Sequence, residues 1–263
     1  MKQRTKRQQK QIDYFLREKH SRKEKQELIH NKELPKFVEK HLPVVRRLSR
    51  NLDQLLIVSS FYSPPIKLGI IDRLLIVAEL EDVKPIICLN KSDLVFDKLE
   101  IDSVRSIYKN IGYKVIVTSA KTGRGIKELK KMIQDKRSAL SGHSGVGKSS
   151  LLNKVQPNLQ ILTGNVSEWS NKGRHTTSQL TTYKLDETTT LVDLPGLKKL
   201  DFLDIHKTEA KIYFKEFNYF AEECKFANCL HLTEQQCAVK KAVEEAKISS
   251  ARYDSYLNFI ESL

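Results

Sequence analysis

Residues 142–149, GHSGVGKS, match the phosphate-binding loop pattern G-x-x-x-x-G-K-[ST] at every fixed position. Glycines let the backbone turn so that successive N–H groups point at phosphate oxygens. In this pattern Lys148 contacts the β- and γ-phosphates, and the Ser149 hydroxyl binds Mg²⁺. We expect a nucleoside triphosphate to contact the whole loop and the first turn of the helix that follows: Gly142, His143, Ser144, Gly145, Val146, Gly147, Lys148, Ser149 and Ser150.

A second pattern, Asn90-Lys91-Ser92-Asp93, follows the apolar run PIICLN and fits N-K-x-D. The Asp93 carboxylate can accept hydrogen bonds from the ring N–H and the exocyclic amine of guanine, whereas adenine has no donors there. Binding of adenine would leave that carboxylate unpaired, which is costly. We expect Asn90 to brace the loop and the Lys91 stem to pack on the base. The pattern therefore predicts specificity for guanine.

The segment Ser119-Ala120-Lys121 lies at the end of a third predicted strand, KVIVTSA (114–120), and matches the second guanine-contacting loop of such domains. In that loop a backbone N–H faces the carbonyl of the base. These three residues complete the predicted base-binding set.

The segment Asp193-Leu194-Pro195-Gly196 closes a β-branched run and fits D-x-x-G. Asp193 would hold Mg²⁺ through water, and the Gly196 N–H would contact the γ-phosphate. Thr176 and Thr177 are both candidates for the threonine that completes the Mg²⁺ shell, and the sequence does not choose between them. The predicted magnesium set is Ser149, Asp193 and this threonine, taken as Thr177.

The order of these motifs is unusual for a GTPase. Both base-binding segments, at 90–93 and 119–121, precede the phosphate-binding loop, and D-x-x-G comes last. In ordinary GTPases the base-binding motifs come last, so the sequence predicts a circular permutation. The segment after D-x-x-G then leads directly into the carboxyl-terminal region.

Three of the four cysteines lie within fourteen residues of each other, with a histidine among them. The set Cys224, Cys229, His231 and Cys237 offers three thiolates and one imidazole. These ligands suit a closed tetrahedral Zn²⁺ site with a structural role. Cys88, inside an apolar run, is expected to be a buried small side chain.

The formal net charge is +14, and residues 1–50 contribute 16 Lys and Arg against 6 Asp and Glu, a net +10. This concentration of charge indicates a polyanionic partner, and nucleic acid fits best. No apolar run approaches the roughly 20 residues of a membrane span, and the amino terminus lacks the apolar core of a signal peptide. We therefore expect a cytoplasmic protein without membrane contact.

Apolar runs alternate with amphipathic segments from residue 50 onward, which predicts an α/β fold with a mostly parallel sheet covered on both faces. The last two runs, LTTYKL and TTTLVDLPG, are separated by a short turn and predict a hairpin. The predicted domains are a basic, weakly ordered or helical arm at 1–49, a permuted GTPase domain at 50–205, and a zinc-binding module with a terminal helix at 206–263.

These segments together resemble the RsgA family of GTPases that depend on the small ribosomal subunit. The resemblance covers roughly residues 50–263 and includes NKSD, SAKTG, SGHSGVGKSSLLN, GRHTTS, DLPG and the cysteine-rich segment, in the family's order. It implies a monomeric factor that binds the small subunit and its 16S rRNA late in maturation, with GTP, GDP, Mg²⁺ and Zn²⁺ as ligands. It also implies that hydrolysis of GTP is coupled to release.

Two features bear on this resemblance. Leu197 occupies the place where Ras-like enzymes carry a glutamine that orients water, so another group must do so. The family implies His175 for this role, beside Lys148 and Gly196 as catalytic residues; a histidine that contacts RNA is the alternative. Family members usually carry a five-stranded OB domain before the GTPase domain, which residues 1–49 cannot supply.

Two other functions remain open from the sequence. One is an RNA-binding scaffold that holds GTP without hydrolysing it, which Leu197 would permit. The other is a permuted GTPase of the large subunit, because the motifs of the GTPase domain do not name the substrate.

Overall fold

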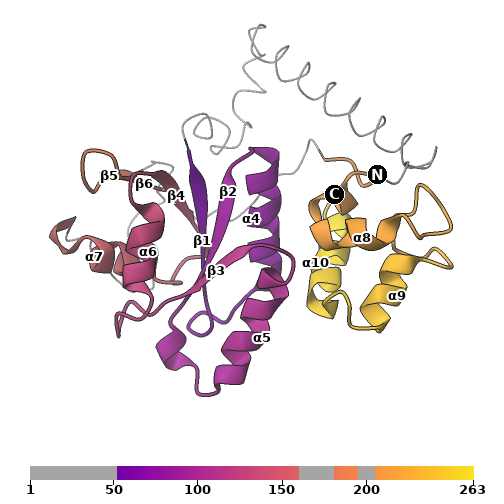
Figure 1. Cartoon of the computed structure of the whole chain (residues 1–263), viewed down its shortest axis with the longest axis horizontal. Coiled ribbons are helices and arrows are strands. Elements are labelled where there is room, and N and C mark those ends of the chain that lie inside the picture. The colour runs from indigo at the N-terminus through magenta and orange to yellow at the C-terminus, as the bar shows by residue number, and fades with distance from the viewer. Residues whose placement is uncertain (1–51, 160–180, 195–204) are drawn as a thin grey trace, which may run out of the picture. The chain divides into compact units, whose positions relative to one another are not determined.

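The computed structural model describes residues 52–159, 181–194 and 205–263 (Figure 1). By its internal contacts the chain divides into two units, 1–44 and 45–263, and every described residue belongs to the second. The predicted arm at 1–49 lies outside the described residues, and the predicted domain boundaries stay predictions. No helix within the described ranges is long and apolar enough to cross a membrane.

A six-stranded sheet runs through the described part of the chain in the order β3-β2-β1-β4-β6-β5. Every neighbouring pair is parallel except β5 and β6, which form the predicted antiparallel hairpin. The predicted sheet is therefore confirmed. The strands are β1 (Gln54–Ser60), β2 (Lys84–Asn90), β3 (Lys114–Val117), β4 (Arg137–Ser141), β5 (Thr181–Lys184) and β6 (Thr190–Asp193).

Helices cover both faces of this sheet (Figure 1), and β1 shows why. All seven of its residues are buried, and their side chains alternate between the two faces. Leu55 and Ile57 enter the core beneath α4 and α5, whereas Leu56 and Val58 enter the core beneath α6 and α7. These helices are α4 (Leu68–Leu80), α5 (Lys98–Lys109), α6 (Ile126–Ile133) and α7 (Lys148–Val155).

Two predicted elements end differently in the structure. The third strand stops at Val117 and does not continue to residue 120, because the Ser119 N–H donates to the Arg124 carbonyl within its own turn, 3.0 Å away. The tail from 238 forms two helices, α9 (Ala238–Glu244) and α10 (Ser250–Glu261). They are separated at Ala246, which has a positive φ of 55°.

The carboxyl-terminal region, residues 205–263, packs against α4. Its core contains Ile76 of α4 together with the buried aromatic residues Phe214, Phe217, Tyr256 and Phe259. The 3-10 helices Ala210–Tyr213 and Lys215–Phe217 and the short helix α8 (Asn218–Ala221) complete the region.

A buried cluster of charges joins this region to α4. The Arg252 guanidinium donates to Asp72 of α4 at 2.6 Å and to both carboxylate oxygens of Glu216 at 2.7 and 3.1 Å. Its planar fork also lies over the Phe214 ring, 4.6 Å from the ring centre. Burial raises the pKa of Asp72, and the Arg252 charge opposes that rise. The guanidinium thus favours the ionised form of Asp72, against the effect of burial.

Replacing Arg252 with Met should keep most of the packing but leave Asp72 and Glu216 without their cation. We expect the free energy of unfolding to fall by about 3–5 kcal/mol, measured by urea denaturation. Arg73→Met is the matched control, because Arg73 reaches the same region only through exposed hydrogen bonds to Asn258 and Ser262. Equal losses in the two variants would contradict a special role for the buried cluster.

Candidate nucleotide-binding site and metal cluster

The phosphate-binding loop connects the carboxyl end of β4 to the amino terminus of α7, as its motif requires. Two of its glycines are demanded by close contacts. A Cβ at Gly142 would lie 2.1 Å from the Val58 carbonyl oxygen, and one at Gly147 would lie 2.5 Å from the Asn90 Nδ2. Gly147 also has a φ of +94°, which disfavours any side chain. Residues of β1 and β2 therefore approach this loop closely.

Asn90 connects the three predicted nucleotide-binding loops. Its Nδ2 donates to the Val146 carbonyl of the phosphate-binding loop at 2.9 Å. Its Oδ1 accepts from the Ala120 N–H and from the Thr118 hydroxyl, both at 3.2 Å. The side chain is 1% exposed, so these bonds are not shared with bulk water. The structure thus brings together the segments 90–93, 119–121 and 142–149 that the sequence predicted to form one site.

Asp93 and Ser119 meet across the base-binding loops. The Ser119 hydroxyl donates to Asp93 Oδ1 at 2.5 Å and accepts from the Thr122 N–H at 3.1 Å. Asp93 itself is exposed, which leaves its carboxylate accessible to a ligand. Lys91 has a positive φ of 57° and its Nζ donates to the Ser63 carbonyl. Lys121 is exposed at the edge of the same loop.

Lys148 and Asp193 form the charged part of the phosphate end. The Lys148 Nζ donates to the Gly142 carbonyl at 3.0 Å, inside the loop. Burial lowers the pKa of Lys148, and the Asp193 charge opposes that shift. Burial raises the pKa of Asp193, and Lys148 opposes that shift in turn. Each charge therefore stabilises the ionised form of the other.

The donor set at this end fits Mg²⁺. The Asp193 Oδ1 is buried and has no hydrogen-bond partner among the described residues, and Ser149 is a half-buried residue in the first turn of α7. Carboxylate and hydroxyl oxygens are the ligands that Mg²⁺ takes. The remaining predicted residues, His175, Thr176, Thr177 and Gly196, lie outside the described residues, as does Leu197. Their roles stay predictions.

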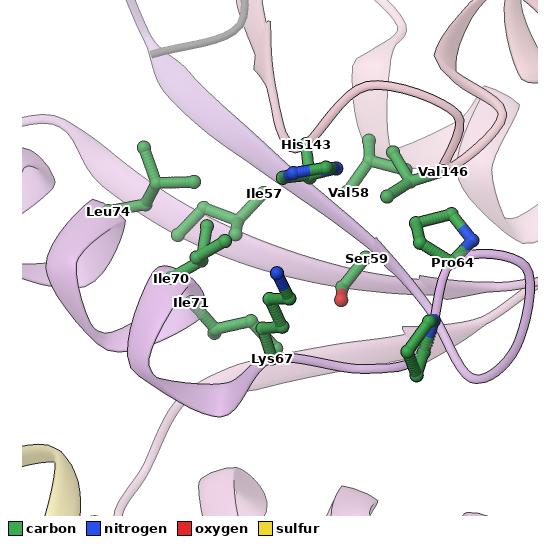
Figure 2. A pocket seen from close by; sticks show the side chains of 11 residues that line it. Ile57, Val58, Ser59, Pro64, Lys67, Ile70, Ile71, Leu74, His143 and Val146 are labelled. Atoms are coloured by element: carbon green, nitrogen blue, oxygen red, sulfur yellow. The ribbon is translucent and has the colours of Figure 1, made fainter. Parts of the chain in front are cut away.

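A small, mainly apolar pocket adjoins the phosphate-binding loop (Figure 2). It lies between β1, the turn after it, α4 and the loop, and Lys67 and His143 line opposite sides. The His143 ring faces this pocket, and its Nδ1 lies 2.8 Å from the Ser144 carbonyl oxygen. The predicted contact of His143 with the nucleotide stays a prediction.

Cys224, Cys229, His231 and Cys237 form the predicted metal cluster. All four are buried, and their ligand atoms lie within 4.8 Å of one another. The Cys224 and Cys237 sulfurs are 3.9 Å apart, and His231 Nδ1 lies 3.7 Å and 3.4 Å from them. A tetrahedral Zn²⁺ with Zn–S bonds of about 2.3 Å separates two sulfurs by about 3.8 Å. The arrangement therefore fits zinc.

The environment of His231 suits a ligand. Burial, aided by the charge of Lys211, lowers the pKa of His231 to about 4, so its ring is neutral near pH 7. A neutral imidazole is the form that binds a metal.

Several residues that support these sites carried no signal in the sequence. Glu234 accepts the N–H groups of Leu230 and Leu232 at 2.6 and 2.7 Å, which fixes the loop that holds His231. The Tyr253 hydroxyl donates to the His231 carbonyl at 2.6 Å. Thr118 would have been the easiest to find, because it immediately precedes the predicted segment 119–121.

Comparisons with known proteins agree with this geometry. The family model described as RsgA GTPase matches residues 25–203. A protein of Caldanaerobacter subterraneus named small ribosomal subunit biogenesis GTPase RsgA is 41% identical over 220 residues, which cover 84% of this chain and 74% of the relative. A relative of the same name from Flavobacterium psychrophilum is 40% identical, over 81% of this chain and 66% of its own length. The chain thus spans about two thirds to three quarters of these relatives.

Solved structures give the same result for the fold. The crystal structure of YjeQ from Thermotoga maritima matches with a TM-score of 0.66 and 37% identity, over 81% of this chain and 72% of that one. YloQ, described as a circularly permuted GTPase, matches with a TM-score of 0.62 and 35% identity, over 80% and 68% of the two chains. The predicted permuted GTPase fold is therefore confirmed.

Replacing Gly147 with Ala should disturb the contact between the phosphate-binding loop and Asn90. We expect nucleotide affinity to fall at least about tenfold, which is about 1.4 kcal/mol, in a titration with fluorescent GDP. Gly123→Ala is the control, because Gly123 has a similar φ of +86° but its Cβ would meet nothing within 4 Å. A similar loss in both variants would show that backbone strain, and not the contact with Asn90, causes the effect.

The cysteine cluster should carry metal in the purified protein. We expect about one Zn²⁺ per chain by elemental analysis, and a lower metal content with a lower melting temperature in Cys237→Ser. Cys88→Ser is the control, because Cys88 is equally buried but lies in β2, outside the cluster. Unchanged zinc content in Cys237→Ser would contradict the assignment.

Proposed function

The chain belongs to the RsgA GTPase family, and from this premise we propose that it hydrolyses GTP while bound to the small ribosomal subunit, whose late maturation it assists. Relatives that are about 40% identical carry the name small ribosomal subunit biogenesis GTPase. The small subunit and its 16S rRNA are accordingly the proposed partners. A cytoplasmic location follows from that partner, and we expect the protein to act as a monomer.

One observation supports this proposal most strongly. The Asn90 side chain bonds both to the loop that precedes α7 and to the loop at 119–121, so the guanine-binding and phosphate-binding segments face a common site. This convergence is what binding of a guanine nucleotide requires, and turnover is what separates an enzyme from a scaffold that only holds GTP. The permuted order of the motifs changes the connections between strands, while their carboxyl ends meet at one edge of the sheet.

At the base end, we propose that Asp93 selects guanine. Its exposed carboxylate accepts the two guanine donors, while the Ser119 hydroxyl holds one carboxylate oxygen in place. The Lys91 stem covers one side of the base, because its positive φ and its bond to Ser63 direct it across the loop. Adenine would leave the carboxylate unpaired, which costs enough to exclude it.

At the phosphate end, Lys148 exchanges the Gly142 carbonyl for the β- and γ-phosphate oxygens when a nucleotide binds. Ser149 and Asp193 would hold Mg²⁺, with Thr177 or Thr176 as a further ligand. The ion supplies positive charge to the phosphates when bound. The Lys148 charge favours the ionised form of Asp193, because it opposes the rise that burial causes in the pKa of this carboxyl group.

Hydrolysis also needs a group that orients water. Leu197 cannot do this, and we propose His175 for the role, with the Gly196 N–H at the γ-phosphate. Zinc bound by the cysteine cluster has a structural role in this proposal, because three thiolates and one imidazole complete a tetrahedral site. The basic side chains of the arm at 1–49 would bind the phosphates of rRNA.

Hydrolysis of GTP, measured alone and with purified small or large ribosomal subunits, tests the proposal. We expect the small subunit alone to raise the rate of GTP hydrolysis at least about tenfold. This factor corresponds to a decrease of about 1.4 kcal/mol in the activation free energy. Stimulation by the large subunit alone would replace the proposed partner, and absence of turnover with either would favour a scaffold that binds GTP without hydrolysing it.

The same assay tests His175. We expect His175→Ala to lower stimulated turnover by about 10²-fold or more with unchanged GTP affinity, as loss of a general base does. His206→Ala, at an exposed histidine of the carboxyl-terminal region, is the control. Unchanged turnover in His175→Ala would remove this residue from the proposal and leave the partner assignment intact.

A further inference from the structure

Helix α6 has one buried face and one strongly basic face. Ile126, Leu129 and Ile133 enter the core beneath the sheet. Lys127, Lys130 and Lys131 are all exposed, and their spacing of three and four residues places them together on the opposite face. We call these three residues the α6 lysine face.

The fold itself does not account for this face. None of its three lysines forms an ion pair with another described residue, whereas Lys241 and Lys247 in the carboxyl-terminal region both pair with Glu245. The helix dipole favours Lys130 and Lys131, which lie in the last turn. It disfavours Lys127, which lies in the first turn. Like charges at this spacing also repel by about 0.2–0.5 kcal/mol per pair.

The positive charge continues beyond the helix at both ends. Lys121 and Arg124 precede it in the guanine-binding loop and Lys136 follows it, all three exposed. Residues 121–136 hold six basic and two acidic residues, a net +4. One of the two acidic residues, Asp135, accepts a hydrogen bond from the Thr188 hydroxyl. A run of exposed cations, none of them in an ion pair within the described part of the chain, therefore begins at the edge of the predicted nucleotide site.

The chemistry of this surface selects the kind of partner. Membrane-surface helices insert an apolar face, but the apolar face of α6 is buried in the core. Protein interfaces favour aromatic residues and are poor in lysine. The large apolar side chains that are exposed, Tyr62, Leu94, Phe96, Leu99, Tyr219 and Phe226, all lie on other elements. Lysines without apolar neighbours suit the phosphates of a nucleic acid.

We propose that the α6 lysine face binds the phosphate backbone of RNA. This inference rests on the proposed function, which supplies rRNA as the nucleic acid. Binding here is independent of base sequence, because phosphate contacts carry no sequence information. Since α6 and α4 cover opposite faces of the sheet, the carboxyl-terminal region that packs on α4 stays free while RNA lies along α6 (Figure 1).

Binding of the full chain to a fluorescent RNA duplex, measured over a range of salt concentrations, tests the proposal. The test variant is Lys127→Gln, Lys130→Gln and Lys131→Gln together, since glutamine keeps helix propensity and removes charge. The matched control is Lys98→Gln, Arg105→Gln and Lys109→Gln, three exposed residues of α5 on the other side of the sheet. Both triple variants lower the net charge by the same amount.

We expect the α6 variant to lose affinity on the order of tenfold or more and its salt slope to fall by about 2 to 3, while the α5 variant changes little. Equal losses in both variants, or an unchanged slope, would overturn the proposal. Tighter binding of the wild type to polyglutamate than to the RNA duplex would also overturn the proposal. The partner of the α6 lysine face would then be an acidic protein and not RNA. Thermal unfolding confirms that each variant is folded.

Measurement of GTP hydrolysis by the wild type and the α6 variant distinguishes an error in the RNA surface from an error in the proposed function. The α6 variant should keep the intrinsic GTPase rate, because none of its three residues belongs to the nucleotide site, and should need more small subunit for half-maximal stimulation. If the small subunit stimulates the wild type and the α6 variant equally at every concentration, the RNA surface is wrong and the proposed function stands. If the wild type is not stimulated, the proposed function itself fails.

Discussion

The Asn90 side chain is shared by loops that follow three different strands, and the geometry of the nucleotide site depends on it. Its amide donates to one loop and accepts from another, and it is too deeply buried to exchange either bond for water. Loss of one partner would leave a buried polar group unpaired, at a cost of about 1–3 kcal/mol. The three loops are therefore coupled: none can move far without disturbing the other two.

This coupling explains why a permuted chain can keep a GTPase site. The loops meet because β2, β3 and β4 are parallel members of one sheet, so their carboxyl ends lie at a common edge. The order in which the chain visits these strands changes only the connections between them. The approach of Gly147 to Asn90 then needs a glycine at that point, whatever the order.

Much of this architecture could be predicted from local patterns. Apolar runs indicated the strands, and fixed spacings indicated both the nucleotide loops and the cysteine cluster, because each of these signals lies within a few neighbouring residues. The cluster of Asp72, Glu216 and Arg252 gave no such signal, since its members are 36 and 180 residues apart. The end of β3 at Val117 was missed for a related reason: a backbone bond in the following turn takes Ser119 out of the sheet.

Helix α4 begins after the turn whose Ser63 carbonyl accepts from Lys91, and its later turns carry Asp72, Ile76 and Glu79 into contact with the carboxyl-terminal region. Thirteen helical residues span about 20 Å and resist compression along their axis. The helix therefore connects the turn next to the loop at 90–93 with the carboxyl-terminal region. By thermodynamic linkage, any free energy that nucleotide binding transmits through α4 to the carboxyl-terminal region returns equally as an effect of that region on nucleotide affinity.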